Sequence, residues 1–170
     1  MEVIQSMSVV LRPYQEEAIS CIHTNLQVSD TALCVLPTGA GKTVVFSEII
    51  RQMQVKTLVL AHRKELLDQA KNKITVAWPD ADIGLVGYGQ SRYGAHITVA
   101  SVASLCSPHR RVQLGQEDIR LLVIDEAHHS MAESYLSVLE ALRGEVKIIG
   151  FTATPERLDK KDIRELSVLC

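Results

Sequence analysis

Short, continuous apolar runs alternate along this chain with longer segments in which apolar residues recur every three or four positions. The short runs predict strands that are buried on both faces, as in a parallel sheet, and the longer segments predict helices that cover it. No internal repeat, low-complexity tract or long linker interrupts this order. The pattern therefore predicts one α/β domain, with a mainly parallel sheet and helices on both of its faces.

The individual elements follow from the same pattern and from turn residues. Between Ile83 and Gly94, four glycines indicate a short strand and a loose turn. The other predicted strands are Ala32–Leu36, Thr57–Leu60, Ile97–Ala100, Leu121–Ile124 and Lys147–Phe151. The predicted helices are Tyr14–Leu26 with Pro13 at its start, Lys42–Gln54, a segment from about Glu65 to Ala77, and Ala132–Leu142, which ends near Gly144.

A glycine-rich turn comes directly after the first predicted strand. Glycines at 39 and 41 would let the main chain wrap a polyphosphate and present N–H groups to it at the start of the next helix. Lys42 would reach the β- and γ-phosphates, and the Thr43 hydroxyl would ligate Mg²⁺. Leu36 stands where the strict phosphate-loop pattern has its first glycine, and a plain glycine-rich turn is the alternative. The predicted nucleotide-binding residues here are Pro37, Thr38, Gly39, Ala40, Gly41, Lys42 and Thr43.

An acidic pair, Asp125 and Glu126, follows the predicted strand Leu121–Ile124. Asp125 could complete the shell of a magnesium ion, and Glu126 could orient and polarise an attacking water. Alone, such a pair is as often a strand end or a helix cap. Since ligands bind at the carboxyl edge of an open α/β sheet, the glycine-rich turn and the acidic pair together predict an ATPase site that uses ATP and Mg²⁺, with Glu126, Lys42 and Asp125 catalytic.

Composition sets the remaining limits. The 170 residues suffice for one core, and a formal net charge of −2 gives no global basic field, so any nucleic-acid contact must be local. The histidines show no metal-ligand spacing, and the cysteines form no CxxC pair, which favours reduced thiols inside a cell. No apolar stretch is long enough for a membrane span, so we expect an intracellular protein without a membrane partner. The four cysteines are Cys21, Cys34, Cys106 and Cys170.

With these motifs in order, the chain resembles the first RecA-like motor domain of superfamily 2 helicases and translocases, in the DEAH-motif form, from about Arg12 to Asp159. The segment 11–15 resembles the adenine-recognition segment of that family. The resemblance implies that Gln15, with Arg12 beside it, binds the adenine edge, since an amide offers both a donor and an acceptor. An exposed helix residue is the alternative for Gln15.

Two further segments resemble nucleic-acid contacts of the family. Residues 60–66 contain Arg63 at a strand-to-helix junction, where its guanidinium could clasp a backbone phosphate. Residues 98–101 contain Thr98 and Ser101, which resemble a second backbone contact. A solvated helix start for Arg63, and turn or capping hydroxyls for the other two, are the alternatives. DNA or RNA bound through its backbone would be recognised with little base specificity.

The segment 151–155 resembles the family segment that links hydrolysis to movement. Thr152 and Thr154 could hydrogen-bond to His128 or Glu126 and so transmit the nucleotide state to the neighbouring surface. A simple Thr-Pro turn is the alternative. The continuation 156–159 is in the style of double-stranded-DNA translocases and restriction-enzyme motor subunits more than of DEAD-box RNA helicases.

The resemblance also implies a partner, a second RecA-like domain that supplies an arginine finger, and no small-molecule substrate other than ATP. No arginine in this chain matches the finger, so we expect the chain alone to bind ATP weakly, to hydrolyse it slowly and not to unwind a duplex. Two other functions stay open: a regulatory module that binds nucleotide without motor activity, and a small-molecule kinase with the same phosphate loop.

Overall fold

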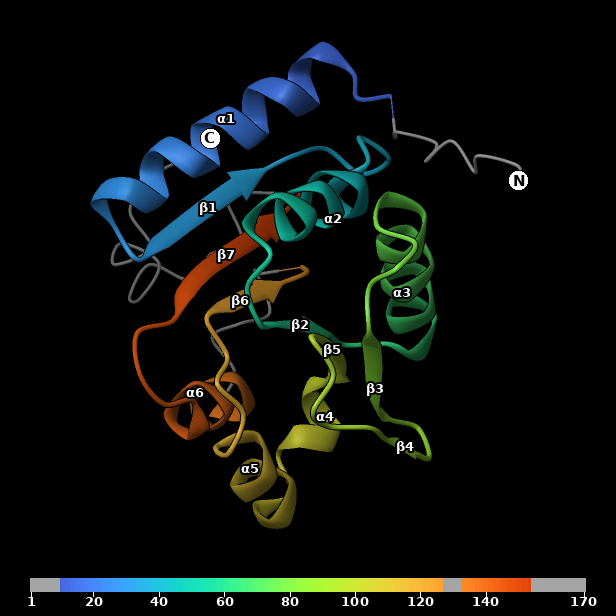
Figure 1. Cartoon of the computed structure of the whole chain (residues 1–170), viewed down its shortest axis with the longest axis vertical. Coiled ribbons are helices and arrows are strands. Elements are labelled where there is room, and N and C mark those ends of the chain that lie inside the picture. The colour runs from blue at the N-terminus through green and yellow to red at the C-terminus, as the bar shows by residue number, and fades with distance from the viewer. Residues whose placement is uncertain (1–9, 127–132, 154–170) are drawn as a thin grey trace.

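The computed structural model describes residues 10–126 and 133–153, and it is a layered α/β domain (Figure 1). The strands are β1 Thr31–Val35, β2 Thr57–Ala61, β3 Ile83–Gly87, β4 Gln90–Ser91, β5 Ile97–Ser101, β6 Leu121–Ile124 and β7 Lys147–Thr152. The helices are α1 Pro13–Val28, α2 Lys42–Met53, α3 Lys64–Ala77, α4 Val102–Leu105, α5 Pro108–Leu114 and α6 Glu133–Ala141.

One sheet contains all seven of these strands, in the order β1-β7-β6-β2-β5-β3-β4. Every pairing is parallel except that of β3 with β4, which form an antiparallel hairpin. The predicted fold class is therefore confirmed. The central strands β2, β5 and β6 are buried along their whole length, which is why they read as continuous apolar runs in the sequence.

The sheet separates two hydrophobic cores. On one face α1, α2 and α3 pack with Ile22, Phe46 and Ile74 fully buried, and the ring of Phe46 meets that of Phe151 from β7 at 5.7 Å between centroids. On the other face α4, α5 and α6 contribute Leu105, Leu114 and Tyr135. Figure 1 shows α1 to α3 in the upper and right part of the view and α4 to α6 in the lower part.

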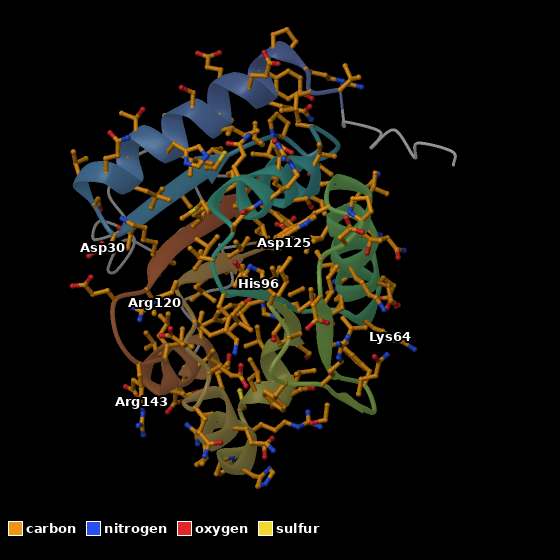
Figure 2. All side chains as sticks on the ribbon, viewed as in Figure 1. Asp30, Lys64, His96, Arg120, Asp125 and Arg143 are labelled. Carbon is orange, nitrogen blue, oxygen red and sulfur yellow. The ribbon has the colours of Figure 1, made fainter. Side chains whose placement is uncertain are left out.

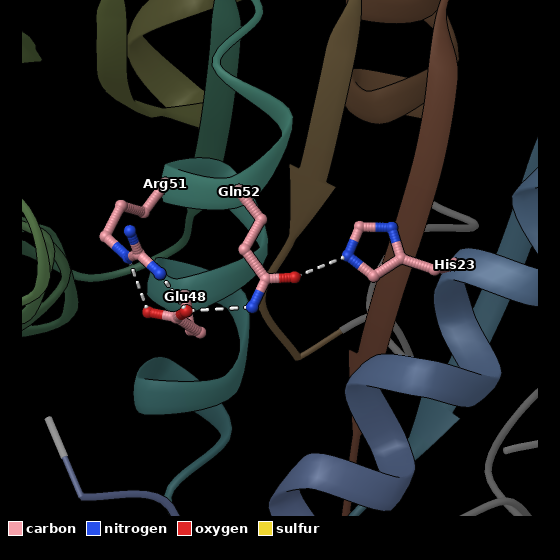
Figure 3. Close-up of polar contacts among 4 residues, drawn as sticks. All are labelled: His23, Glu48, Arg51 and Gln52. Atoms are coloured by element: carbon pink, nitrogen blue, oxygen red, sulfur yellow. Dashed lines mark hydrogen bonds and ion pairs between the residues drawn. The ribbon is translucent and has the colours of Figure 1, made fainter.

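A polar chain ties α1 to α2 on the outside of the first core (Figure 3). Glu48 accepts hydrogen bonds from Nε of Arg51 and Nε2 of Gln52, both at 2.8 Å, and these bonds lower its pKa against the effect of burial. The Gln52 amide therefore turns its oxygen toward Nε2 of His23, 2.9 Å away on α1. Since α1 begins beside the glycine-rich loop and α2 follows it, this chain helps to fix both flanks of the loop.

The predicted strands and helices appear with small changes at their ends. Pro13 and Val28 extend the first helix, and β2, β5 and β7 are each one residue longer than expected. Ala132, the expected start of the last helix, lies outside the described residues. The helices α4 and α5 were not predicted, because each is too short to show a helical period.

The cysteines follow the prediction in part. Cys34 and Cys106 are free thiols. Cys21 is disulfide-bonded, so the expectation of reduced thiols does not hold for this residue, because residue spacing says nothing about which side chains approach one another in space. Within the described residues, no helix is both long and apolar enough to cross a membrane.

Figure 2 labels residues from both ends of the strands. Asp30 and Arg120 directly precede β1 and β6, whereas Asp125 and Lys64 lie just beyond β6 and β2. The glycine-rich loop also follows a strand, β1, and it lies at the same carboxyl edge as Asp125. This edge is where an open parallel sheet binds its ligands.

Candidate nucleotide-binding site

The loop of residues 36–41 leads from β1 into α2 with two left-handed residues. Gly39 has φ +82° and Gly41 has φ +81°, a region that costs other L-residues roughly 1–2 kcal/mol. Gly41 occupies the N-cap position of α2, so the amides of Lys42 and Thr43 open the first helical turn. These donors and the positive end of the helix dipole point out of the loop, which is the arrangement that binds phosphate groups.

Gln15 holds the loop from the side of α1. Its side-chain Nε2 donates to the carbonyl oxygen of Ala40 at 3.0 Å, and its Oε1 accepts from the amide of Arg12 at 2.9 Å. A Cβ on Gly41 would stand 2.6 Å from the same Nε2. Gln15 is buried, contrary to an exposed helix residue. Among the described residues, its amide has one N–H and one lone pair without a partner.

A pocket of about 210 Å³ opens between the start of α1 and this loop. The hydroxyl of Tyr14 donates to the Ala40 carbonyl at 2.9 Å on its wall. Both residues predicted for adenine recognition, Arg12 and Gln15, line it. The complete lining is Val10, Arg12, Tyr14, Gln15, Gly39, Ala40, Gly41 and Val44.

The acidic pair meets the loop directly. The Nζ of Lys42 lies 3.0 Å from Oε1 of Glu126, although the two residues are 84 positions apart in the sequence. The side chains are 11% and 29% exposed, respectively, so the contact is largely screened from water. Parallel pairing of β6 with β7, and of β7 with β1, brings the ends of these strands to one edge and so produces this juxtaposition.

The backbone of Glu126 is strained. Its φ is +56°, which is uncommon for a residue with a Cβ, and its amide donates to Oδ1 of Asp125 at 3.0 Å. The amide of Asp125 itself donates to the carbonyl of Leu60 on β2 at 3.1 Å. Residues in sparsely populated backbone conformations concentrate at functional sites, where the surrounding structure holds them.

Burial changes the acid–base properties of this edge. The pKa of Asp125 is raised, first by desolvation and then by the charge of Glu126, while Lys42 acts in the opposite direction. Burial also raises the pKa of the Cys34 thiol on β1 to about 11, against the charge of Lys42, so this thiol is neutral at pH 7. The charged form of Asp125 is unfavourable at this buried position unless a cation is near. This property fits a site that binds a cation.

Thr43 and Asp125 provide a hydroxyl and a carboxylate, which are oxygen ligands of the kind that Mg²⁺ prefers. Thr43 is in the first turn of α2, where its backbone carbonyl accepts from the Ser47 hydroxyl at 2.6 Å. Among the described residues, no group of three or more His, Cys, Asp or Glu side chains could hold a metal alone. One or two protein ligands completed by water and phosphate oxygens is the usual arrangement for Mg²⁺ with a nucleotide.

The predicted nucleic-acid residues are placed differently from one another. Arg63 is exposed and occupies the N-cap position of α3, two residues after the end of β2. Ser101 ends the neighbouring strand β5, paired with Ala61. Thr98 lies inside β5 between β2 and β3 and is 1% exposed, so its side chain does not reach a surface ligand. We therefore withdraw Thr98, because burial in the middle of a strand excludes the contact. The side chain of Ser101 is also only 1% exposed.

The predicted coupling residues are described only in part. Thr152 ends β7, is fully buried, and its carbonyl accepts from the amide of Leu36 at 2.9 Å, which fixes the start of the glycine-rich loop. His128 and Thr154 lie outside the described residues.

Three residues that contact this edge were not predicted from the sequence: Tyr14, His62 and Tyr135. Tyr14 has a signal in its position next to Gln15 in the segment 11–15. His62 and Tyr135 are hydrogen-bonded across 73 positions, with 2.8 Å between Nε2 and the phenol oxygen, and no local pattern marks such a pair.

A comparison with known families now places the chain. Residues 8–157 match the model described as the type III restriction enzyme, res subunit. The chain belongs to this family. Its fold is that of the first RecA-like domain of superfamily 2 helicases and translocases, as predicted.

Individual relatives agree with this assignment. IRC3 of Saccharomyces cerevisiae, provisionally named an ATP-dependent helicase, is 36% identical over 89% of this chain. The DNA 3'-5' translocase XPB2 of Sulfurisphaera tokodaii is 37% identical over 90% of it. Among solved structures, the Sulfolobus solfataricus SWI2/SNF2 ATPase core in complex with dsDNA superposes over 98% of the chain with a TM-score of 0.73 at 16% identity, a likeness of fold.

The chain spans 24% of the length of IRC3 and 33% of that of XPB2, and it covers 37% of the SWI2/SNF2 structure. This chain therefore corresponds to only part of the length of each of these proteins.

Proposed function

We propose that this chain is the ATP-binding domain of a nucleic-acid-dependent motor, and that the glycine-rich loop and the acidic pair bind and hydrolyse ATP. The contact between Lys42 and Glu126 is the observation that carries this proposal. It brings the phosphate-binding lysine and the water-polarising carboxylate to within 3.0 Å at the carboxyl edge of the sheet. A regulatory module that only binds nucleotide has no need of a carboxylate at this position.

Each residue has a defined part in this proposal. The amides of Gly39, Gly41, Lys42 and Thr43 bind the phosphate oxygens, and Lys42 exchanges its contact with Glu126 for the β- and γ-phosphates. Glu126 is then available to accept a proton from the attacking water. Thr43 and Asp125 would hold Mg²⁺, which when bound neutralises charge that develops on the phosphates.

The base-recognition part of the proposal rests on the 210 Å³ pocket and on the remaining hydrogen-bond capacity of Gln15. One donor and one acceptor on the same amide match the two polar atoms at the exposed edge of adenine. Because Gln15 also supports the Ala40 carbonyl, occupation of the pocket by a base would stabilise the loop that binds its phosphates. This arrangement favours ATP over nucleotides with other bases.

The nucleic-acid part of the proposal rests on the edge next to the ATP site. Arg63 is an exposed cation at the start of α3, where the amides of the first helical turn also face outward, so it would contact a backbone phosphate. Double-stranded DNA is the partner we favour, because the relative XPB2 is named a DNA translocase and the SWI2/SNF2 core was solved with dsDNA.

Motor activity would belong to a longer protein that carries a second RecA-like domain with an arginine finger. On this proposal the 170-residue chain binds ATP with Mg²⁺ weakly and hydrolyses it slowly, since a finger typically increases the rate by roughly 10³–10⁵. Thr152, with His128 and Thr154, would link the nucleotide state to that domain. We also propose an intracellular location.

The test compares the parent with Glu126→Gln for binding of a fluorescent ATP analogue and for phosphate release with and without duplex DNA. We expect the variant to keep nucleotide affinity within a few-fold and to lose about 10²–10⁴ in rate, since general-base catalysis contributes about that factor. Glu117→Gln, which changes a carboxylate at the other end of the sheet, is the matched control. Unchanged hydrolysis in Glu126→Gln, or turnover by the longer protein with a second RecA-like domain that does not respond to DNA, would contradict the proposal.

A further inference from the structure

His62 stands at the point where the ATP site and the proposed nucleic-acid edge meet. It is the first residue after β2 and directly precedes Arg63. Leu60 on β2 pairs with Ile124 on β6, so the two strands end side by side. The chain therefore leaves the sheet at two neighbouring points. His62 follows β2 at one of them, and Glu126 follows β6 at the other.

Hydrogen bonds hold His62 on two sides. Its ring Nε2 and the phenol oxygen of Tyr135 on α6 are 2.8 Å apart, and the two rings meet edge to face with 5.3 Å between centroids. Its backbone carbonyl accepts a hydrogen bond of 3.3 Å from the hydroxyl of Tyr88, at the turn between β3 and β4. The segment that carries Arg63 is thus fixed both to the ATP side and to the outer edge of the sheet.

Tyr135 is fully buried, and the charges of the acidic pair affect its pKa. Its pKa is raised first by burial and then by the negative charges of Asp125 and Glu126, so the phenol stays protonated. A change of charge at these carboxylates, as when Lys42 leaves Glu126 or a cation arrives, therefore acts on the hydroxyl that holds His62.

Backbone strain flanks the same residue. Among the described residues, non-glycine residues with positive φ are Gln54, Tyr88 and Glu126. Gln54 is the ordinary C-cap of α2, whereas Tyr88 donates to His62 and Glu126 follows the strand next to it. Two residues with uncommon backbone conformations thus lie around His62: Tyr88, which contacts it through its hydroxyl, and Glu126, which leaves the sheet beside it.

We propose that His62 and Tyr135 are positioning residues that couple the nucleotide state of the Asp125–Glu126 pair to the placement of Arg63. On this proposal His62 and Tyr135 contact neither nucleotide nor nucleic acid. They set how strongly binding of one ligand changes the affinity for the other. Such coupling is reciprocal: ATP changes the affinity for DNA by the factor by which DNA changes the affinity for ATP. This inference rests on the proposed function, because it assumes nucleic acid at the Arg63 edge.

The experiment measures binding of a fluorescently labelled DNA duplex to the full chain by anisotropy, with and without saturating AMP-PNP and Mg²⁺. The ratio of the two dissociation constants is the coupling factor. Tyr135→Phe removes the hydroxyl and keeps the ring, and we expect it to bring the factor at least about threefold closer to one. Nucleotide affinity alone, and DNA affinity without nucleotide, should stay within about twofold of the parent.

Matched variants separate coupling from a general loss of structure. Tyr93→Phe also removes a buried phenol oxygen, which has no hydrogen-bond partner in the described part of the chain, and should leave the factor unchanged. His62→Ala should lower the factor as Tyr135→Phe does, and the double variant should lower it no further. His62→Gln, whose side-chain amide offers both a donor and an acceptor to the Tyr135 hydroxyl, should keep part of it.

The outcomes are distinct. A Tyr135→Phe coupling factor equal to that of the parent, or a loss of DNA affinity that is the same with and without nucleotide, would overturn this inference and leave the ATPase proposal standing. Parent protein whose DNA binding does not respond to AMP-PNP at all would instead contradict the proposed function, and the inference with it.

Discussion

The two ends of the parallel strands carry charges in contrasting ways. At the amino end, Arg120 pairs with Asp118 at 2.9 Å and Lys147 lies 3.8 Å from Asp30, with the carboxylates 72% and 79% exposed. At the carboxyl end, Lys42 and Glu126 meet at 3.0 Å with far less exposure, beside a buried Asp125. Exposed pairs of the first kind contribute about 0–1 kcal/mol, because water screens them.

This difference in charge pairing indicates that function is concentrated at the carboxyl end of the strands. The amino end also has a more buried ion pair, Lys56 with Glu117. There the Glu117 carboxylate is paired with the lysine and also accepts a hydrogen bond from the amide of Gly94 at 3.1 Å. At the carboxyl end a strained backbone at Glu126 and a raised pKa at Asp125 persist together. Sites that violate local rules in this way are the expected places for function.

The largest effect should come from removing Lys42, the lysine at the carboxyl end of the strands. Lys42→Ala should weaken ATP binding about tenfold to a hundredfold, because a hydrogen bond to a charged group contributes about 1.5–3 kcal/mol. Lys56→Ala, at the amino end, should leave nucleotide affinity unchanged. Titration with a fluorescent adenine nucleotide in the presence of Mg²⁺ measures both, and equal affinities for Lys42→Ala and the parent would end the assignment of the pocket.

Glycine variants of the loop sharpen the contrast between strain and contact. Gly39 and Gly41 share a positive φ, yet a Cβ at Gly39 meets no atom within 4 Å, whereas one at Gly41 meets Gln15 at 2.6 Å. Gly39→Ala should cost roughly 1–2 kcal/mol of unfolding free energy. Gly41→Ala should cost more, and should also weaken nucleotide binding by displacing Gln15. Thermal unfolding with and without ATP separates the two, and identical behaviour would mean that the contact with Gln15 is unimportant.

The smallest effect concerns pH. Because the folded-state pKa of Asp125 is raised, the folded chain holds this proton more tightly than the unfolded chain, so its contribution to stability falls as pH rises from about 4 toward the folded pKa. Asp125→Asn should remove this loss and raise the melting temperature of the nucleotide-free chain at pH 7. Asp118→Asn, at the exposed amino end, is the control and should change it little. A lower melting temperature for Asp125→Asn would contradict the pKa assignment.

The sequence predicted most of the fold, because its strands are buried on both faces and its main helices are amphipathic. It did not predict α4 and α5, which are too short for a period to appear. Thr98 was wrongly taken as a surface contact, since a hydroxyl within an apolar run gives no sign of facing a core. The residues of the candidate nucleotide site were predicted together because glycines, lysine and acidic residues each carry a chemical signal at the end of a strand.

What the sequence determined by itself is the set of groups at the carboxyl edge: a loop that only glycine permits at Gly39 and Gly41, a lysine after it, and two carboxylates after a buried strand. The tertiary structure alone decided which of them touch. The strand order β1-β7-β6-β2 brings Lys42 to Glu126 and His62 to Tyr135 across 84 and 73 positions. Contacts of this kind depend on how strands are ordered and paired, and no local pattern of residues encodes that order.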